Sequence, residues 1–330
     1  MNENNKLYPL KFIPICKDKI WGGGKIFKLL QKQEASTEHC GECWEISGIA
    51  DNVSQVKNGF LKSNDLNELL EVYMSDLVGE GIYDRFEDNF PLLIKFIDAS
   101  DDLSVQVHPD KKSSKKIPNA QSKTELWYIM HAEADAKLYI GFKQGVTKES
   151  FFEGVAENRV EEMLETYPVQ TGDIFFIPGG TVHAIGKGIL LAEIQQASDT
   201  TYRIYDWNRK DEKGNSRELH LDLAEKVLNF DETSSPKIDY DKTKQGTTPL
   251  LRNPFFNLNY LLLTQPTEKV YIEIDSFVIY VCVEGEVSIV MDESDVFTLK
   301  KGETILKPAA CDELTFLPTP SAKLLEIYME

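Results

Sequence analysis

The feature that most constrains the fold of this chain is a succession of short β segments separated by turn residues. Stretches such as PLLIKFIDA (91–99), ELWYIM (125–130), DIFFIP (173–178) and FVIYVCV (277–283) are rich in β-branched and aromatic residues. Residues of these types favour strands, and the intervening turn residues limit each strand to a few residues. The sequence therefore predicts a mainly β protein. Its 330 residues are enough for two domains.

Three stretches depart from the β pattern and are predicted to be helical. In 64–74, Leu66, Leu69, Leu70 and Tyr73 recur at the spacing of one helix face. The stretches 147–167 and 219–230 carry apolar residues at similar spacings, with Thr147 as the N-cap of the first. We therefore expect a few helices inserted in, or packed on, the first β domain.

A weak internal repeat indicates that the chain contains two β units of one design. Gly172 and Pro178 are separated by the same interval as Gly302 and Pro308. Upstream, 130–140 matches 281–290 in its strand–turn–strand pattern, and the first copy carries extra residues where the helix after Thr147 is expected. The stretch 231–254 is polar and rich in turn residues, so we place a domain boundary near Pro236–Leu250. The expected domains are residues 1–235 and 236–330.

The first copy of this repeat has the form G-x5-P-x-G-x2-H from Gly172 to His183, which resembles the second sequence motif of cupin barrels. Glycine permits the tight hairpin that such a motif requires, and Pro178 needs no hydrogen-bond donor at a strand edge. The resemblance implies two cupin-like β-barrel domains of the jelly-roll type.

Polar side chains at matching strand positions predict a metal site in the first domain. Gln106 and His108 are two residues apart, as are Lys123 and Glu125, so each pair leaves one face of its strand. With His183 they provide two imidazoles, a carboxylate and an amide oxygen, a donor set suited to catalytic Zn²⁺. The alternative is a buried hydrogen-bond network without a metal.

The second copy of the repeat lacks these donors. Glu313 stands where the first copy has His183, and no Gln-x-His pair precedes it. We therefore expect one Zn²⁺ per chain, held in the first domain.

Further polar residues follow His183 along the chain. Glu193 and Gln195 share one strand face, and Asp199 and Arg203 lie in the polar segment after it. An arginine beside a zinc site can stabilise an oxyanion or bind a phosphate. The alternative for Arg203 is a surface ion pair with Asp199 or Asp206.

Together these motifs resemble those of type I mannose-6-phosphate isomerases, in their short bacterial form. The motifs are WGG (21–23), GECWEIS (41–47), QVHPDK (106–111), KTELWY (123–128), GTVHAIG (180–186) and EIQQASDTTYRIYDW (193–207). The resemblance covers the first ~230 residues in the same order and is more specific than any single motif.

The resemblance implies an aldose–ketose isomerase that converts mannose 6-phosphate and fructose 6-phosphate through a cis-enediol(ate). It implies Zn²⁺ on Gln106, His108, Glu125 and His183, and Arg203 as the catalytic arginine. Lys123, Glu193 and Asp199 are expected to line the sugar pocket, and Trp21, Ser104 and Lys111 to contact the substrate. The general base is left open between Glu193, Lys123 and a water molecule.

Other functions share parts of this pattern. An iron dioxygenase or a cupin-type glucose-6-phosphate isomerase would use similar ligands, although Gln106 in place of a second adjacent histidine disfavours iron. A non-catalytic sugar-binding cupin is disfavoured by Lys123 and Arg203 beside the ligands.

Charge and cysteine content restrict the partners and the compartment. The net charge of −18 argues against nucleic acid and anionic membranes, but not against a phosphorylated substrate. No apolar run is long enough to span a membrane and no secretory signal is visible, so we expect a cytoplasmic protein. We expect it to be a monomer or a homodimer.

The odd number of cysteines predicts no disulfide framework. The CxxC at Cys40–Cys43 is interpreted as ordinary buried cysteines rather than half a zinc site or a redox pair.

Overall fold

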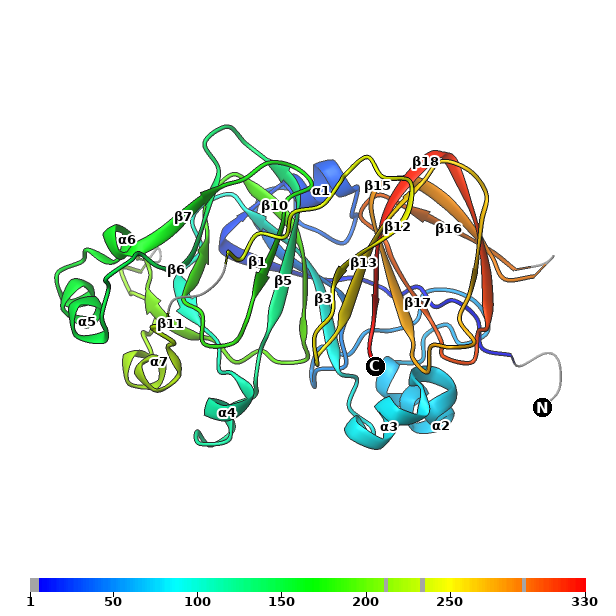
Figure 1. Ribbon diagram of the computed structural model, residues 1–330, viewed down its shortest axis with the longest axis horizontal. Helices are drawn as coiled ribbons and strands as arrows, with labels where there is room; N and C mark the ends of the chain where they lie inside the picture. The colour runs from blue at the N-terminus through cyan, green and yellow to red at the C-terminus, as the bar shows by residue number, and fades with distance from the viewer. Residues whose placement is uncertain (1–5, 211–212, 232–234, 293–294) are drawn as a thin grey trace.

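The computed structural model describes residues 6–210, 213–231, 235–292 and 295–330, and it is mainly β, as predicted. Two β units lie side by side along the long axis of the molecule (Figure 1). We call the unit made of the first two sheets the N-terminal β unit, and the unit made of the third sheet the C-terminal β unit.

The N-terminal β unit contains two antiparallel sheets. The first sheet has, in spatial order, the strands β1 (Ile15–Gly23), β2 (Cys40–Ile46), β3 (Leu92–Ala99), β10 (Ile189–Gln196), β5 (Glu125–Ala132) and β8 (Ile174–Ile177). The second sheet has β11 (Tyr202–Tyr205), β4 (Val105–Val107), β9 (His183–Ile185), β6 (Lys137–Phe142) and β7 (Leu164–Pro168).

The C-terminal β unit is built on one seven-stranded sheet. Its main path is β12 (Gly246–Leu251), β13 (Asn257–Leu263), β18 (Glu313–Tyr328), β15 (Val278–Val290) and β16 (Val296–Lys300), while β14 (Thr267–Val270) pairs with β18 and β17 (Thr304–Lys307) with β15. The β15–β17 pair repeats the β5–β8 pair of the N-terminal unit, as the sequence repeat predicts.

Seven short helices connect or cover these strands within the described residues. They are α1 (Lys25–Leu30), α2 (Leu66–Val78), α3 (Glu80–Phe86), α4 (Lys111–Ser114), α5 (Lys148–Ala156), α6 (Val160–Met163) and α7 (Leu221–Val227). The three helical stretches predicted from the sequence are present, and Thr147 caps α5 by accepting a hydrogen bond from the Ser150 amide. The predicted helix over 147–167 is too long, because residues from Leu164 onward form the edge strand β7 instead.

The first sheet has two apolar faces, so both β units share one core. On β10, Leu190, Ala192 and Ile194 face outward and pack in a cluster that includes Ile279 and Ile327 of the C-terminal unit. The alternating residues of β10 face the interior of the N-terminal unit, where Ile189 and Leu191 belong to a separate cluster. Both faces of the sheet are therefore buried.

Segments from the first part of the chain extend this shared core onto the C-terminal unit. The backbones of Leu10 and Leu306 exchange two hydrogen bonds, of 2.8 and 2.9 Å. Helices α2 and α3 also lie against the C-terminal unit (Figure 1), where the Phe277 amide donates to Val78 O and the Ala309 amide to Leu77 O. The predicted polar connection between the units, 231–254, contains residues 232–234, which lie outside the described residues.

A disulfide bond joins Cys16 and Cys43, which the cysteine count did not predict. The two residues are direct cross-strand partners on β1 and β2, and that register cannot be read from sequence spacing. Cys40, the other cysteine of the CxxC, is free and buried, in agreement with its interpretation as an ordinary core residue. Among the described residues, no helix combines the length and apolar character needed to cross a membrane.

Candidate metal centre

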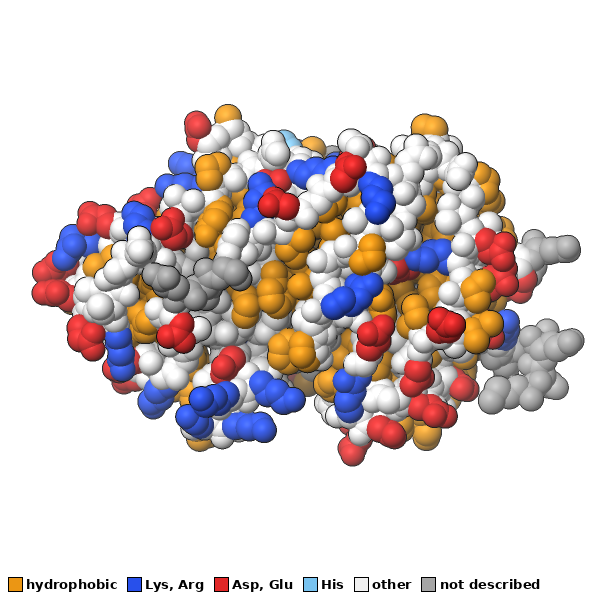
Figure 2. Space-filling view, in the orientation of Figure 1, with side chains coloured by type: hydrophobic (Ala, Val, Ile, Leu, Met, Phe, Trp, Pro, Cys, Tyr) orange, Lys and Arg blue, Asp and Glu red, His pale blue; other side chains and the backbone are white. Residues whose placement is uncertain are grey.

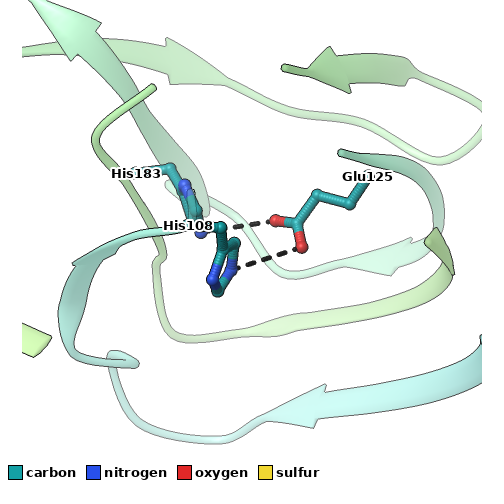
Figure 3. Close-up of side chains that lie close together, drawn as sticks. All are labelled: His108, Glu125 and His183. Carbon is teal, nitrogen blue, oxygen red and sulfur yellow. Dashed lines mark ion pairs between the residues drawn. The ribbon is translucent and has the colours of Figure 1, made fainter. Parts of the chain in front are cut away.

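The two histidines and the glutamate predicted as metal ligands converge inside the N-terminal β unit. His108 follows β4, Glu125 begins β5 and His183 begins β9, so three strands from both sheets supply them. One ligand atom from each lies within 4.8 Å of the others (Figure 3). Each of the three residues is at most 1% exposed. This is the only such group of His, Cys, Asp and Glu side chains in the described part of the chain.

Backbone carbonyls fix the orientation of both imidazoles. His108 Nδ1 lies 2.8 Å from Thr200 O, and His183 Nδ1 lies 2.9 Å from Thr181 O. A carbonyl can only accept a hydrogen bond, so Nδ1 carries the proton in each ring and Nε2 presents a lone pair. Burial lowers the pKa of His183 to about 4 and holds the pKa of His108 well below its usual value. Both rings are therefore neutral donors at neutral pH.

The Glu125 carboxylate faces these lone pairs and fits a cation bound between them. Its Oε1 is 3.3 Å from His183 Nε2 and its Oε2 is 3.4 Å from His108 Nε2. Oε1 is buried and accepts no hydrogen bond from the described residues, which is costly unless a cation satisfies it. Burial raises the pKa of the carboxyl, and the Lys123 ammonium opposes that rise.

The Lys123 side chain already brings a positive charge to the donor set. Its Nζ lies 2.8 Å from Glu125 Oε2 and 3.2 Å from His108 Nε2. Gln106 Nε2 lies 3.3 Å from His183 Nε2, and because amide nitrogen and oxygen differ little in shape, a flip would turn Oε1 toward the same point. The site thus offers two imidazole nitrogens, a carboxylate and an amide oxygen, a set that suits Zn²⁺.

A cavity of about 320 Å³ opens beside this donor set. Seven of the predicted site residues line it, namely Trp21, Ser104, Gln106, Lys123, Glu193, Asp199 and Arg203. Its charged lining comprises five basic side chains (Lys19, Lys95, Lys123, Arg203, Arg217) and three acidic ones (Glu42, Glu193, Asp199). The cavity is therefore positively charged in a chain whose net charge is −18.

Lys111 is the one predicted site residue that the structure leaves away from the ligands and outside the lining of this cavity. It is the first residue of α4 and is exposed, because the Asp110 side chain caps that helix and turns the following lysines outward. The basic surface of this region is visible at the lower left of Figure 2.

Lys95 is a buried cavity residue that sequence reasoning missed. It lies on β3, is 4% exposed, and its Nζ is 3.3 Å from Glu193 Oε2 on the neighbouring strand. Burial opposes its charge, but Glu193 and Glu42 outweigh burial and raise the pKa of Lys95. A lysine inside the otherwise apolar run LLIKFI was the available signal, because lysine is rarely buried without a partner.

Glu193 is ionised in this environment. Its Oε1 accepts a 3.0 Å hydrogen bond from Trp127 Nε1. Burial alone would raise its pKa, but Lys123, Lys95 and the Trp127 hydrogen bond lower the pKa of Glu193 to about 2. Glu193 is thus a fixed negative charge at neutral pH.

Arg203 is held at the cavity by the backbone that follows β11. Its Nη1 donates to Glu218 O at 2.8 Å, and its buried Nε has no hydrogen-bond partner among the described residues. It forms no ion pair with a described acidic side chain, and Asp206 pairs instead with Arg209 and Arg217. The surface ion pair considered for Arg203 is therefore absent.

The chain is similar in sequence to known isomerases. A family model described as phosphomannose isomerase type I, catalytic domain, matches residues 10–124. Mannose-6-phosphate isomerase ManA of Bacillus subtilis is 35% identical over 309 residues, which cover 92% of this chain and 94% of that protein.

The fold also matches solved structures. The crystal structure of mannose 6-phosphate isomerase from Bacillus subtilis superimposes with a TM-score of 0.86 at 30% identity, covering 97% of this chain and 99% of that one. A mannose 6-phosphate isomerase bound with zinc and yttrium has a TM-score of 0.75 at 17% identity, covering 98% and 100%, and at that identity it shows the fold alone. Since a relative of 35% identity spans almost the whole chain, and the motifs converge as that resemblance implies, the chain belongs to the type I phosphomannose isomerase family.

Proposed function

We propose that this chain is a zinc-dependent isomerase that interconverts mannose 6-phosphate and fructose 6-phosphate. The observation that carries the proposal is that Gln106, Lys123 and Arg203 line one positively charged cavity. His108, Glu125 and His183 lie together directly behind Gln106 and Lys123. Gln106 pairs directly with Arg203 on one side and with His183 on the other, so these three residues share one face of the second sheet.

The choice of zinc follows from the ligand chemistry. Two neutral imidazoles, a carboxylate and an amide oxygen leave coordination open for a substrate oxygen. When bound, Zn²⁺ supplies a Lewis acid beside the sugar oxygens of the substrate.

The side chains that line the cavity are assigned to the oxyanion, the phosphate and the sugar. Arg203 stabilises the negative charge that develops on the sugar oxygen as the C2 proton leaves. We assign the phosphate to Ser104, Lys95 and Arg217, which provide one hydroxyl group and two cations in the lining of the cavity. Trp21 and Asp199 border the sugar, the first buried and the second exposed.

The low pKa of Glu193 makes it a weak base, so we assign the proton transfer to a water molecule, or to Lys123 once its ammonium group has given up a proton. A general base works best when its pKa lies near the operating pH, and a carboxylate of pKa about 2 is far from it. Glu193 then acts by holding the Lys95 ammonium against the cavity. Lys123 lies beside the metal donors and lines the cavity that we assign to the sugar.

We also propose that the chain divides near residue 235 into a metal-binding catalytic domain and a C-terminal domain without metal donors. The metal donors all lie before it, and the C-terminal β unit contributes the apolar surface that covers the outer face of the first sheet. We expect the protein to act in the cytoplasm as a monomer or homodimer, with a small sugar phosphate as its partner and neither nucleic acid nor membrane.

The experiment that tests this function is isomerisation followed by NMR in D₂O. Mannose 6-phosphate should convert to fructose 6-phosphate, with solvent deuterium entering at the carbon that receives the proton. Glucose 6-phosphate, in parallel, tests the alternative aldose. No conversion of mannose 6-phosphate by zinc-loaded protein would refute the proposal.

A further inference from the structure

A second charged cavity, separate from the metal centre, lies at the junction of the two β units. We call it the seam cavity. It measures about 200 Å³ and is lined by the N-terminal segment, the end of α1 and the following loop, β2, and the turn between β16 and β17. Helix α1 lies over this junction (Figure 1).

The walls of the seam cavity are held together by close contact across the junction. Gly302, in the β16–β17 turn, has φ +82° and approaches α1 so closely that an added Cβ would stand 2.7 Å from Leu30 Cβ. The ammonium of Lys11 pairs with Glu303 Oε2 at 2.9 Å. Both β units therefore contribute to a built site rather than to a gap between domains.

Lysines outnumber carboxylates in the lining. Five lysines (Lys11, Lys32, Lys57, Lys300, Lys301) and three glutamates (Glu34, Glu45, Glu303) line the seam cavity. Lys301 has no ion pair with a described residue, and Lys300 has only a long one, of 3.4 Å, with Glu286. An excess of positive charge in a chain of net charge −18 favours an anionic ligand.

Glu45 provides a second, independent indication of a ligand. It is 3% exposed and sits where the register between β2 and β3 shifts, at the kind of irregularity that redirects a side chain. Its Oε2 pairs with Lys32 Nζ at 2.7 Å, but its Oε1 is buried and has no hydrogen-bond partner in the described part of the chain. A buried acceptor of this kind needs a donor such as a hydroxyl group.

We propose that the seam cavity binds a small phosphorylated polyol. Its hydroxyl group donates to Glu45 Oε1, and its phosphate is held by Lys300 and Lys301 at the β16–β17 turn. The volume is below the ~300 Å³ at which pockets for drug-sized ligands begin, so a three- or four-carbon compound fits better than a nucleotide. The proposal concerns a site apart from the metal centre and does not rest on the isomerase activity.

Calorimetric titration with glycerol 3-phosphate at low ionic strength tests the site, with inorganic phosphate and glycerol as parallel probes. We expect two binding events in the wild type, one in the metal-centre cavity and one in the seam cavity. The K300A/K301A double variant should lose the second event, with at least tenfold weaker binding, while its turnover of mannose 6-phosphate stays unchanged. K62A/K244A removes the same charge from exposed positions outside the seam cavity and should bind as the wild type does.

Glu45→Gln separates recognition of the polyol from general attraction of anions. It should weaken glycerol 3-phosphate about five- to tenfold and leave inorganic phosphate unaffected, because only the former has a hydroxyl for Glu45. A thermal melt establishes that this variant is folded, and if it is not, the double lysine variant decides alone. Equal affinity for glycerol 3-phosphate in the wild type and in K300A/K301A would overturn the proposal, whether or not the metal-centre cavity also binds this ligand. An equal loss of affinity for glycerol 3-phosphate and for inorganic phosphate in Glu45→Gln would show that the site binds anions without recognising a hydroxyl group. That result would refute the proposed polyol ligand.

Discussion

Gln106 stands directly opposite His183 across the β4–β9 pair, with 3.3 Å between their Nε2 atoms. Arg203 flanks Gln106 on the other side, on β11. Gln106 thus lies between His183, to which we assign metal binding, and Arg203, to which we assign stabilisation of the reacting oxygen. If these assignments hold, the strand register brings metal binding and catalysis together.

The first prediction concerns the ligands. His183→Ala removes one imidazole from a set of four donors and should lower zinc occupancy well below one per chain. Metal analysis of purified protein measures this, with His39→Ala, an exposed histidine, as the matched control. Full zinc content in His183→Ala would remove His183 from the ligand set.

The second prediction concerns Arg203. Arg203→Ala should leave zinc content and melting temperature nearly unchanged and lower kcat by roughly 10²-fold or more, the loss seen when an oxyanion donor is removed. Steady-state kinetics with mannose 6-phosphate measure it. Arg159→Ala removes an arginine that pairs only with nearby glutamates on the surface and should keep wild-type kcat. A kcat near wild type in Arg203→Ala would make the residue structural.

The third prediction concerns Glu193 and pH. A folded-state pKa of about 2 lies below the ordinary value near 4.3, so the ion pair with Lys95 is intact at neutral pH and is lost only as pH falls toward 2. Protonation of Glu193 should therefore cause no fall in kcat/KM on the acid side of the pH profile between pH 5 and 8. Glu193→Gln should lower kcat less than the ~10²–10⁴-fold expected for a general base, and leave the acid limb in place. An acid limb that disappears in Glu193→Gln would identify Glu193 as the base.

Much of this site was predictable because its chemistry is local in sequence. The spacing of Gln106 and His108, and of Lys123 and Glu125, predicts a polar strand face. The glycine–proline hairpin before His183 predicts that the His183 side chain points into the barrel. Glu193 and Arg203 follow from motifs carried by the family resemblance. The two β units follow from the repeat, whose β5–β8 and β15–β17 pairs the structure confirms.

What the sequence could not provide depends on pairing between distant strands. Lys95 becomes a cavity residue only because β3 lies beside β10, which brings Glu193 opposite to it. The Cys16–Cys43 bond depends on the β1–β2 register in the same way. Lys111 is exposed and lies outside the lining of the metal-centre cavity, at the start of the helix that Asp110 caps, although Gln106 and His108 of the same motif lie at the site.

The fourth prediction concerns the shared core. Ile279 of the C-terminal unit is fully buried in the cluster that covers the outer face of the first sheet. Ile279→Ala should lower the free energy of unfolding by about 2–5 kcal/mol without changing zinc bound per folded chain. Denaturant unfolding with metal analysis measures both, and Val296→Ala, at an exposed position, should change neither. Zinc loss in folded Ile279→Ala would place the C-terminal unit in the metal site.

The most direct test of the central claim is turnover of mannose 6-phosphate by the same preparation before chelation, after chelation and after return of Zn²⁺. We predict about one Zn²⁺ per chain and conversion to fructose 6-phosphate at first, loss of both on chelation, and recovery of both when zinc alone is added. Undiminished turnover by metal-free protein, or a zinc-replete protein that does not isomerise mannose 6-phosphate, would contradict the account.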